Sequence, residues 1–249
     1  MKDKGIFLNH VSFQYGAAPK ELNDITAFIA AGSFCAITGT NGSGKTTLTY
    51  LLNGLIPHQI DGKLSGDILI DGVNTKDKSV SYFSRKVGLV FQNPDFMIFN
   101  LTVREEIAFG LSNLGFDHID ERIASALADV GLTGYERRDP HTLSMGQKQK
   151  LSIASVLAME TPYIVLDEPT AMLDYKNTLR LYQLLMSLHR KGKTIVIVEH
   201  DTDFLFTYAS HILLLDKGAL VIEGKPEQVF SQRQKLKRMG IKIPKKLSV

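Results

Sequence analysis

One run of nine residues carries the clearest chemistry in this sequence: Gly39, Thr40, Asn41, Gly42, Ser43, Gly44, Lys45, Thr46 and Thr47. The run fits the pattern G-x-x-x-x-G-K-[S/T]. Its glycines allow backbone N–H groups to converge on an anion. A lysine suits the β- and γ-phosphates of a nucleotide, and a hydroxyl suits Mg²⁺. The sequence therefore predicts that this loop binds nucleotide phosphates, with Thr46 as a metal ligand.

Two acids at the end of an apolar run form the second signal. Residues 163–168 read Tyr-Ile-Val-Leu-Asp-Glu, which is the pattern of a buried strand followed by Asp167 and Glu168. Such a strand places Asp167 at the carboxyl edge of a sheet, where open α/β sheets bind ligands. We expect Asp167 to orient Mg²⁺, and Glu168 to orient and polarise an attacking water.

The elements that must position these residues alternate between strand and helix. Continuous apolar runs such as 195–198 are typical of parallel strands buried on both faces, while the early strands alternate as in an antiparallel sheet. Strands are expected at 6–13, 22–29, 34–38, 67–71, 87–91, 163–167, 194–198, 211–215 and 219–223. Helices are expected at 45–54, 102–112, 119–130, 145–159, 175–190 and 202–208. The predicted fold is α/β: a P-loop NTPase core with a mostly parallel sheet, an N-terminal antiparallel β subdomain and a helical subdomain at about 93–158.

The composition is that of an ordinary globular protein, with 44% hydrophobic and 22% charged residues. No apolar run approaches the ~18 residues needed to span a bilayer. The single cysteine, Cys35, lies in an expected core strand, and a reducing compartment such as the cytosol is the simplest inference. The net charge of +3 is uneven, since the last 19 residues hold seven Lys/Arg and no Asp/Glu. This basic tail, 231–249, is either a solvated terminus or a contact for lipid, nucleic acid or an acidic partner.

A third motif gives the chain its resemblance to a family. Residues 143–147 read Leu-Ser-Met-Gly-Gln and lie about 20 residues before Asp167. In this order and position they resemble the LSGGQ signature of the ATP-binding-cassette (ABC) family. The resemblance implies that Ser144, Met145, Gly146 and Gln147 serve in trans, on ATP held by a second ABC ATPase subunit. Met145 departs from the pattern, because it replaces the first of the paired glycines.

The other family motifs follow in order along about residues 5–230. By resemblance, Tyr15 stacks on adenine, and Gln92 contacts Mg²⁺ and water. Asp174 is the acid of the D-loop, 171–174, which crosses the dimer interface. His200, the switch histidine, contacts the γ-phosphate and holds Glu168 and the water in line. The expected ligands are thus ATP and Mg²⁺.

Finer features resemble the ATP-binding subunits of energy-coupling factor (ECF) transporters, which import vitamins and transition-metal ions. They are the segments 52–57, 91–95, 108–115 and 224–230. The resemblance implies a groove after Gln92 that receives a helix of a transmembrane subunit. Asp95 is placed to contact an arginine there, although a turn-favouring acid after proline is an equal alternative. Met97 stands where a glutamine is expected.

The resulting hypothesis is a transport ATPase with an ABC domain at 1–230, attached peripherally to the cytoplasmic face of the membrane. It pairs as a homodimer or heterodimer, and separate transmembrane subunits bind the small-molecule or ion substrate. No specific nucleic acid is expected. The alternatives are a cassette ATPase acting on nucleic acid or ribosomes, supported only by the basic tail, and a weakly hydrolysing regulatory subunit, suggested by Met145.

Overall fold

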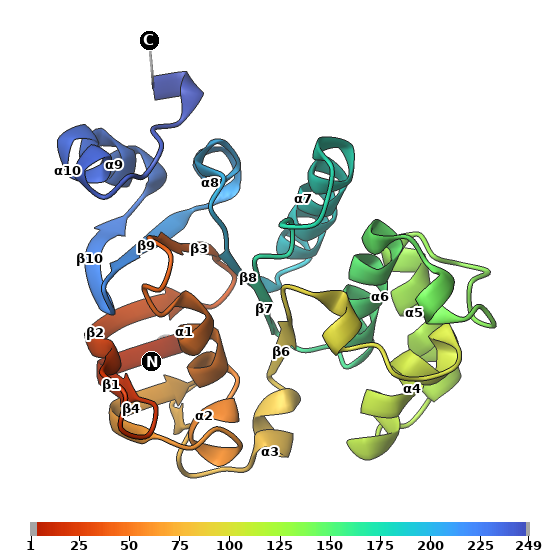
Figure 1. The fold of residues 1–249 in the computed structure, drawn as a ribbon. Coiled ribbons are helices and arrows are strands. Elements are labelled where there is room, and N and C mark those ends of the chain that lie inside the picture. The colour runs from red at the N-terminus through yellow and green to blue at the C-terminus, as the bar shows by residue number, and fades with distance from the viewer. Residues whose placement is uncertain (1–3, 248–249) are drawn as a thin grey trace.

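The strands form two sheets in the computed structural model, which describes residues 4–247. The first three residues of the predicted domain at 1–230 and the last two of the tail at 231–249 lie outside the described residues. The smaller sheet is antiparallel, with the order β2-β1-β4-β5 (Figure 1). Its strands are β1 (Gly5–Gln14), β2 (Lys20–Ala30), β4 (Lys63–Ile70) and β5 (Val73–Asn74). Residues that alternate between buried and exposed along β2 explain why one face of this sheet packs inward.

The larger sheet has the order β10-β9-β3-β8-β7-β6, in which only the edge strand β10 is antiparallel to its neighbour. Its strands are β3 (Phe34–Gly39), β6 (Val87–Val90), β7 (Tyr163–Asp167), β8 (Thr194–Val198), β9 (His211–Asp216) and β10 (Ala219–Gly224). Because β3, β6, β7 and β8 run in one direction, their carboxyl ends meet at one edge of the sheet.

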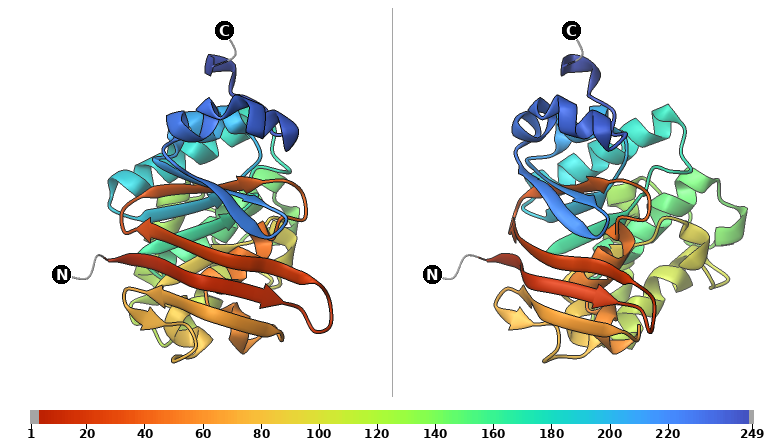
Figure 2. Two further views of the ribbon diagram at one scale, coloured as in Figure 1. Left: turned by 90° about the vertical axis from the view of Figure 1, so that its left-hand side faces the viewer. Right: turned by 60° about the vertical axis from the view of Figure 1, so that its left-hand side comes forward.

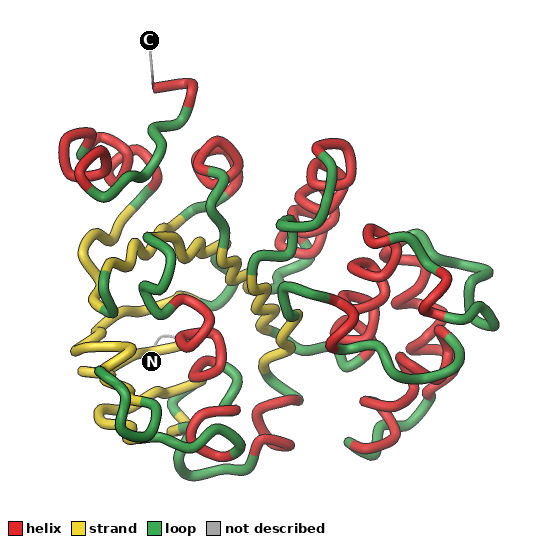
Figure 3. The backbone as a smooth tube through the Cα atoms, in the orientation of Figure 1, coloured by secondary structure: helices red, strands yellow, loops and turns green. Residues whose placement is uncertain are grey.

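Helices cover this sheet and extend from it on one side (Figure 3). They are α1 (Lys45–Leu52), α2 (Leu55–His58), α3 (Val80–Ser84), α4 (Val103–Asn113), α5 (Ile119–Val130), α6 (Met145–Ala158), α7 (Tyr175–Arg190), α8 (Thr202–Tyr208), α9 (Pro226–Ser231) and α10 (Arg233–Arg238). Three short 3₁₀ turns complete the described elements: η1 (Pro94–Phe96), η2 (Pro140–Thr142) and η3 (Lys245–Leu247). Helices α4, α5 and α6 pack on one another as a separate lobe beside the sheet.

The parallel sheet separates two hydrophobic cores. Alternate residues of β3 enter them, since Phe34 and Ala36 join the core under the helices while Cys35 and Ile37 join the core beneath the antiparallel sheet. Both sets are fully buried, as expected for a strand that reads as a continuous apolar run. The predicted α/β class, with an antiparallel subdomain and a helical lobe, is confirmed.

The segment after β10 folds back over the parallel sheet (Figure 2). Leu236 of α10 is fully buried, and Met239, Ile241 and Ile243 pack against the core under the helices. The described part of the basic tail is therefore docked through its apolar residues, whereas most of its lysines and arginines face solvent. This packing does not match the interpretation of the tail as a free, solvated terminus.

The sequence predicts neither four of the short α-helices nor the two-residue strand β5, and it places the start of one strand too late. Helices α2, α3, α9 and α10 have only four to six residues each, too few to display a helical period. Strand β4 starts at Lys63 rather than at residue 67. The sequence pattern hides this start because Gly66, at φ +78°, interrupts the alternation where the register with β1 shifts. None of the helices in the described residues is long and apolar enough to cross a membrane.

One glycine allows the helical lobe to approach the sheet closely. A Cβ on Gly88 of β6 would lie 2.1 Å from Cγ1 of Val156 on α6. We expect Gly88→Ala to lower the free energy of unfolding by about 1–3 kcal/mol, because the extra methyl overpacks this contact. Urea denaturation measures the change, and Val156→Ala in the same chain should restore part of the loss.

The matched control is Gly110→Ala on α4, where the nearest atom would be Met159 Sδ at an ordinary 3.5 Å. This substitution should be neutral or stabilising, since alanine is the better helix former. An unchanged stability of the Gly88→Ala protein would show that β6 and α6 are not in close contact.

Candidate active site

Four strand ends bring the predicted residues to one edge of the parallel sheet. Leu166 of β7 lies opposite Val90 of β6 on one side and Ile197 of β8 on the other. Strand β8 in turn pairs with β3, where Ile37 lies opposite Val198. The residues that directly follow these strands are therefore neighbours, although up to about 160 positions separate them in the sequence.

Two glycines shape the phosphate loop between β3 and α1. Gly39 has φ +149°, and a Cβ there would lie 1.9 Å from the carbonyl oxygen of Leu215. Gly44, at φ +89°, begins α1, and a Cβ on it would meet Leu22 Cδ2 at 2.4 Å. Only glycine fits either position without moving a neighbouring strand. The loop thus follows the predicted strand–loop–helix course, which leaves the N-terminus of α1 open toward an anion.

The lysine of the loop is folded back on its own backbone. Lys45 is 6% exposed, and its Nζ donates to the carbonyl oxygens of Thr40, at 2.9 Å, and Gly39, at 3.4 Å. Burial lowers the pKa of Lys45, while the nearby carboxylates of Glu168 and Asp167 oppose that shift. The ammonium group is thus poorly hydrated, so an anion in the loop would be a better partner than two carbonyls.

The acid predicted to orient Mg²⁺ is buried and only partly compensated. Asp167 is 3% exposed, and its Oδ1 accepts no hydrogen bond among the described residues. Burial raises the pKa of this carboxyl, and Glu168 adds to the rise, while Thr46, Lys45 and His200 act in the opposite direction. A buried carboxylate with a free oxygen is stable only if a cation or donor completes it.

The predicted catalytic residues form one hydrogen-bonded group. Glu168 Oε2 accepts from Nε2 of Gln92 at 3.0 Å, and Glu168 Oε1 lies 2.8 Å from Nε2 of His200. The backbone of Glu168 has φ +43°, and its N–H donates to Val198 at the end of β8. Such a backbone conformation is uncommon outside glycine and often marks a functional residue. The structure therefore brings together Gln92, Glu168 and His200.

The remaining loop residues have identified contacts. Tyr15, at the end of β1, shares a hydrogen bond of 2.9 Å between its hydroxyl and Thr47 Oγ1, and its ring packs edge-on against Phe13. Thr40 donates through its hydroxyl to Asp216 at 2.8 Å. Asn41, Gly42 and Thr46 face solvent, whereas Ser43 is buried. The aromatic ring of Tyr15 is thus tethered beside the phosphate loop.

The signature residues lie apart from this group, at the start of α6. Ser144 caps the helix, because its Oγ accepts from the N–H of Gln147 while Gln147 Oε1 accepts from the N–H of Ser144. Gly146 faces α7, since a Cβ there would meet Asn177 at 3.4 Å. Asp174 caps α7 through the N–H of Asn177. Helix α6 packs on α4, α5, β6 and η1, whereas α1 packs on α2, β7 and the N-terminal strands.

Two orphaned oxygen atoms test whether ATP and Mg²⁺ fit this site. Ser43 Oγ in the loop and Asp167 Oδ1 are buried without a hydrogen-bond partner in the described chain. Oxygen atoms are the ligands that Mg²⁺ prefers, either directly or through a bound water. Among the described residues no group of three or more His, Cys, Asp and Glu could hold a metal by itself. The site therefore fits a metal that shares its ligands with phosphates, as Mg²⁺ does in nucleotide enzymes.

Sequence reasoning missed three participants. Glu199 is buried directly beside His200, and Asp216 anchors Thr40. The C-terminal segment 239–242 lines a cavity of about 370 Å³ together with residues 38–41 and His200. Of these three, only Glu199 could have been found from the sequence, because it is an acid directly beside the switch histidine. Asp216 and the C-terminal segment reach the loop through tertiary packing.

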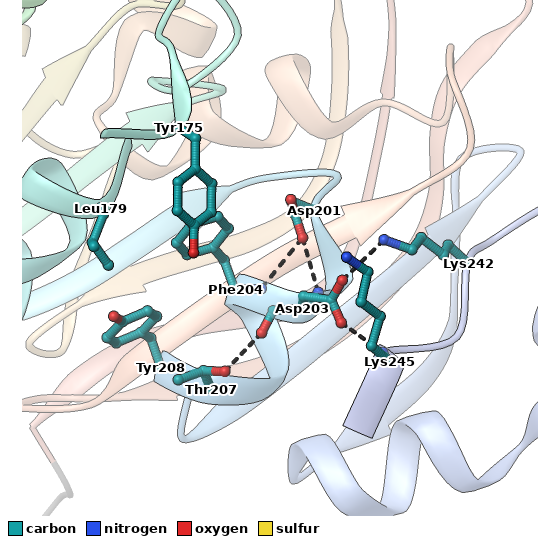
Figure 4. A pocket seen from close by; sticks show the side chains of 9 residues that line it. All are labelled: Tyr175, Leu179, Asp201, Asp203, Phe204, Thr207, Tyr208, Lys242 and Lys245. Carbon is teal, nitrogen blue, oxygen red and sulfur yellow. Dashed lines mark hydrogen bonds and ion pairs between the residues drawn. The ribbon is translucent and has the colours of Figure 1, made fainter. Parts of the chain in front are cut away.

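A second cavity, of about 450 Å³, lies between α7, α8 and the C-terminal segment (Figure 4). Tyr175 and Phe204 form an aromatic wall. On the opposite side Asp203 Oδ2 accepts from Lys242 Nζ at 2.9 Å, and Asp203 Oδ1 accepts from the N–H of Lys245 at 2.6 Å. These contacts tie the C-terminal segment to α8, the helix that follows the switch histidine.

Comparison with known proteins places the chain in a family. The family model described as "ABC transporter" matches residues 22–171, which is more than half of the chain. The chain belongs to the ABC transporter family. A putative ABC transporter ATP-binding protein of Pyrococcus horikoshii is 46% identical over 98% of this chain and 87% of its own length. The energy-coupling factor transporter ATP-binding protein EcfA of Methanothermobacter thermautotrophicus is 38% identical over 96% of this chain and 77% of its own length.

Solved ABC structures share the fold. The cbiO1 protein of Clostridium perfringens, described as part of the ABC transporter complex cbiONQ, superposes with a TM-score of 0.82 at 30% identity, covering 97% of this chain and 96% of that one. A dimeric ATP-binding cassette, MJ0796, with bound ADP and Pi has a TM-score of 0.77 at 28% identity, covering 89% of this chain and 98% of its own. The predicted resemblance to ABC ATPases, and to their ECF-type subunits, is confirmed, and with it the assignment as a transport-coupled ATPase.

Replacing the uncompensated acid should stabilise the ABC ATPase when it is measured without nucleotide. Because the folded-state pKa of Asp167 is raised above its unfolded value, the folded protein loses stability as pH rises through that pKa. Asp167→Asn does not have this loss. Its free energy of unfolding should therefore exceed that of the wild type by an amount that grows from acidic to neutral pH, to on the order of 1 kcal/mol. Urea titrations without nucleotide measure it, and thermal shifts with ATP and Mg²⁺ should be smaller in the variant.

Asp203→Asn is the control with the opposite sign. The hydrogen bond from Lys242, with the N–H of Lys245, lowers the pKa of Asp203. This carboxylate therefore contributes stability above its unfolded pKa that is lost as pH falls, and Asp203→Asn should be less stable at neutral pH. An Asp167→Asn protein that is less stable than wild type at neutral pH would show that the buried carboxylate is fully compensated.

Proposed function

We propose that this chain is the ATP-hydrolysing subunit of an importer of the energy-coupling factor type, which drives uptake of a vitamin or a transition-metal ion through separate membrane subunits. The observation that carries the proposal is the convergence of Gln92 and His200 on the carboxylate of Glu168, beside a phosphate loop. The EcfA relative and the cbiO1 structure support the transporter type.

The phosphate loop supplies the binding groups. Lys45 would move from the carbonyls of Gly39 and Thr40 to the β- and γ-phosphates, while the N–H groups at the start of α1 face the same anion. Thr46 and Asp167 would hold Mg²⁺, with Gln92 reaching it from the end of β6. Tyr15 stands beside Thr47, where it would stack on adenine. ATP, when bound, supplies the γ-phosphoryl group, whose charge Mg²⁺ neutralises.

Hydrolysis then depends on how Glu168 is held. Its carboxylate would accept a hydrogen bond from the attacking water and take up a proton as the water oxygen bonds to the γ-phosphorus and the bond from that phosphorus to the leaving ADP breaks. Gln92 and His200 hold the two carboxylate oxygens from opposite sides, which fixes the direction of that acceptor. His200 would contact the γ-phosphate as well. Preorganised groups of this kind act by positioning and electrostatic stabilisation rather than by covalent chemistry.

The signature residues would act on the site of a second subunit. Ser144, Met145, Gly146 and Gln147 begin α6 in the helical lobe, whose main packing partners are α4, α5, β6 and η1. Near Asp174, two large apolar side chains are exposed, Met172 at 48% and Tyr175 at 74%. Exposed apolar residues beside a functional loop are typical of an interface. The dimeric MJ0796 cassette, which was solved with ADP and Pi, supports a pair of such subunits.

The membrane subunits would dock on an apolar patch, defined here as Phe96, Phe99, Leu101 and Phe109. The four side chains are 46–80% exposed, and they follow Gln92 closely in the chain. Phe99 and Phe109 pack edge to face at 4.7 Å. The buried carboxylate of Glu106 holds the loop beneath them, since it accepts hydrogen bonds from the N–H groups of Phe99 and Asn100. A rigid apolar patch of this kind fits an amphipathic helix.

The two residues singled out after Gln92 have different surroundings. Met97 packs on the core of the helical lobe. Asp95 Oδ1 accepts from Lys148 Nζ on α6 at 2.7 Å, and its N–H donates to Asn93 Oδ1 as in a turn. A partner arginine would therefore have to share Asp95 with Lys148. Through such docking the chain would sit peripherally on the cytoplasmic face of the membrane.

Glu168→Gln should keep ATP binding but lower turnover about 10²-fold or more, because the amide cannot take up the proton of the attacking water. ATP and Mg²⁺ should then hold the variant as a closed dimer. Phosphate release and light scattering measure the two effects. Glu160→Gln, an exposed acid paired with Arg122, is the matched control and should behave as wild type. Normal turnover in Glu168→Gln would remove Glu168 from its proposed role.

Docking can be separated from catalysis by substitutions in the patch. Leu101→Ser, at a side chain that is 80% exposed, should reduce recovery of the transmembrane subunits with this chain after co-expression. ATP binding by the purified chain should not change, because the phosphate loop is untouched. Comparison of Asp95→Ala with Lys148→Ala tests the acid: if a partner arginine binds Asp95, only the first variant loses the membrane subunits. Full recovery with Leu101→Ser and with Asp95→Ala would place docking elsewhere.

A further inference from the structure

A buried acid links the loop that carries the switch histidine to the loop that carries the catalytic acid. Glu199 directly follows β8 and is 5% exposed. Its Oε1 accepts from the N–H of His200 at 2.7 Å and from the N–H of Asp201 at 3.3 Å. Its Oε2 is hydrogen-bonded to the hydroxyl of Thr170. All three donors come from the two loops at the carboxyl edge of the sheet.

Burial of the Glu199 carboxylate lowers the stability of the fold unless both of its oxygen atoms accept hydrogen bonds. Removing a carboxylate from water costs several kcal/mol in proteins, so a buried acid persists where donors satisfy both oxygen atoms. Glu199 meets that condition through two consecutive backbone N–H groups and one hydroxyl. Its own N–H donates to Ile37 of β3 at 3.1 Å, which anchors the residue to the sheet. Its side chain therefore has one well-defined position.

The backbone of the switch loop is consequently held on both sides of His200. Glu199 takes up the N–H of His200 itself, and Asp201 Oδ1 caps α8 by accepting from the N–H groups of Asp203 and Phe204. With the backbone fixed, the imidazole is directed to Glu168, where Nε2 lies 2.8 Å from Oε1. Fixing these torsions in advance lowers the entropy cost of assembling the catalytic group.

Thr170 connects the same acid to the D-loop. It follows Glu168 by two residues, and Leu173 donates its N–H to the carbonyl of Thr170 at 2.9 Å, in the turn that leads to Asp174. The loops after β7 and β8 are thus joined by two side-chain ties, Glu168 to His200 and Thr170 to Glu199. In the second tie Glu199 is 5% exposed, whereas the His200 side chain of the first tie is 41% exposed.

We propose that Glu199 and Thr170 together form a positioning pair that holds the switch histidine against Glu168 and joins its loop to the D-loop. The inference rests on the proposed role of His200 in hydrolysis. Neither member of the pair touches the phosphate loop in the described contacts, so the pair should affect turnover and not the affinity for nucleotide.

The test measures turnover of the full chain with ATP and Mg²⁺, and ATP affinity separately with a fluorescent ATP analogue. Thr170→Val removes the hydroxyl at nearly constant volume and should lower kcat about tenfold with an unchanged dissociation constant. Thr170→Ser restores the hydroxyl and should restore kcat. Thr202→Val is the matched control: its buried hydroxyl has no partner in the described chain and lies two residues from His200. It should leave kcat unchanged.

The acid itself is tested by Glu199→Gln, whose amide oxygen can accept from both backbone N–H groups while its NH₂ donates to Thr170. This variant should retain most of the activity, and Glu199→Ala should not. If Glu199→Ala fails to fold, Thr170→Val and Glu199→Gln still decide the question.

A double-mutant cycle shows whether the pair acts through the histidine. In a His200→Ala chain, Thr170→Val should lower kcat no further. An equal loss in both backgrounds, or an unchanged kcat in the Thr170→Val chain, overturns the positioning pair while leaving the proposed function intact. Full turnover by His200→Ala alone overturns the proposed role of the histidine, and the positioning pair with it.

Discussion

The parallel pairing of β6, β7 and β8 is the constraint on which the site depends. Strand β7 ends in Asp167, and its two neighbours end just before Gln92 and His200, so both side chains reach the carboxylate of Glu168. A slip of one residue in either pairing would turn a side chain to the opposite face of the sheet. The two hydrophobic cores that bury both faces of the sheet prevent such a slip, because the alternate residues of each strand belong to different cores.

The protein's own groups leave the electrostatics of the site incomplete. Lys45 rests on backbone carbonyls with a lowered pKa, and Asp167 keeps one oxygen without a donor and has a raised pKa. Both groups would be better satisfied by a phosphate and a divalent cation than by the protein alone. The chain therefore gives up some stability at the place where ligand charges complete the site, as is common in functional sites.

One subunit contains all the motifs but arranges them on two separate bodies. The phosphate loop and the Glu168 group belong to the sheet, whereas the signature residues begin a helix of the lobe. Packing and polar contacts connect the two, since α6 packs on β6, Lys191 after α7 pairs with Asp129 of α5, and Arg85 after α3 donates to the carbonyl of Leu114. The apolar patch is formed by residues of η1, of α4 and of the loop between them. A partner that binds the patch thus contacts the same segment that leads from Gln92 to the lobe.

The sequence by itself determined the class of fold and identified which residues are of the right type for the proposed chemistry. Motif residues have to be of particular types, and apolar runs at 163–166 and 195–198 directly reveal strands buried on both faces. The tertiary structure alone decided the contacts that cross the chain: the C-terminal segment beside the phosphate loop, Asp216 on Thr40, Lys148 on Asp95 and Thr170 on Glu199. Each joins residues that are 29 to about 200 positions apart, and no local period or spacing encodes such pairs. They arise only when the packed sheet and helices bring distant loops to one edge.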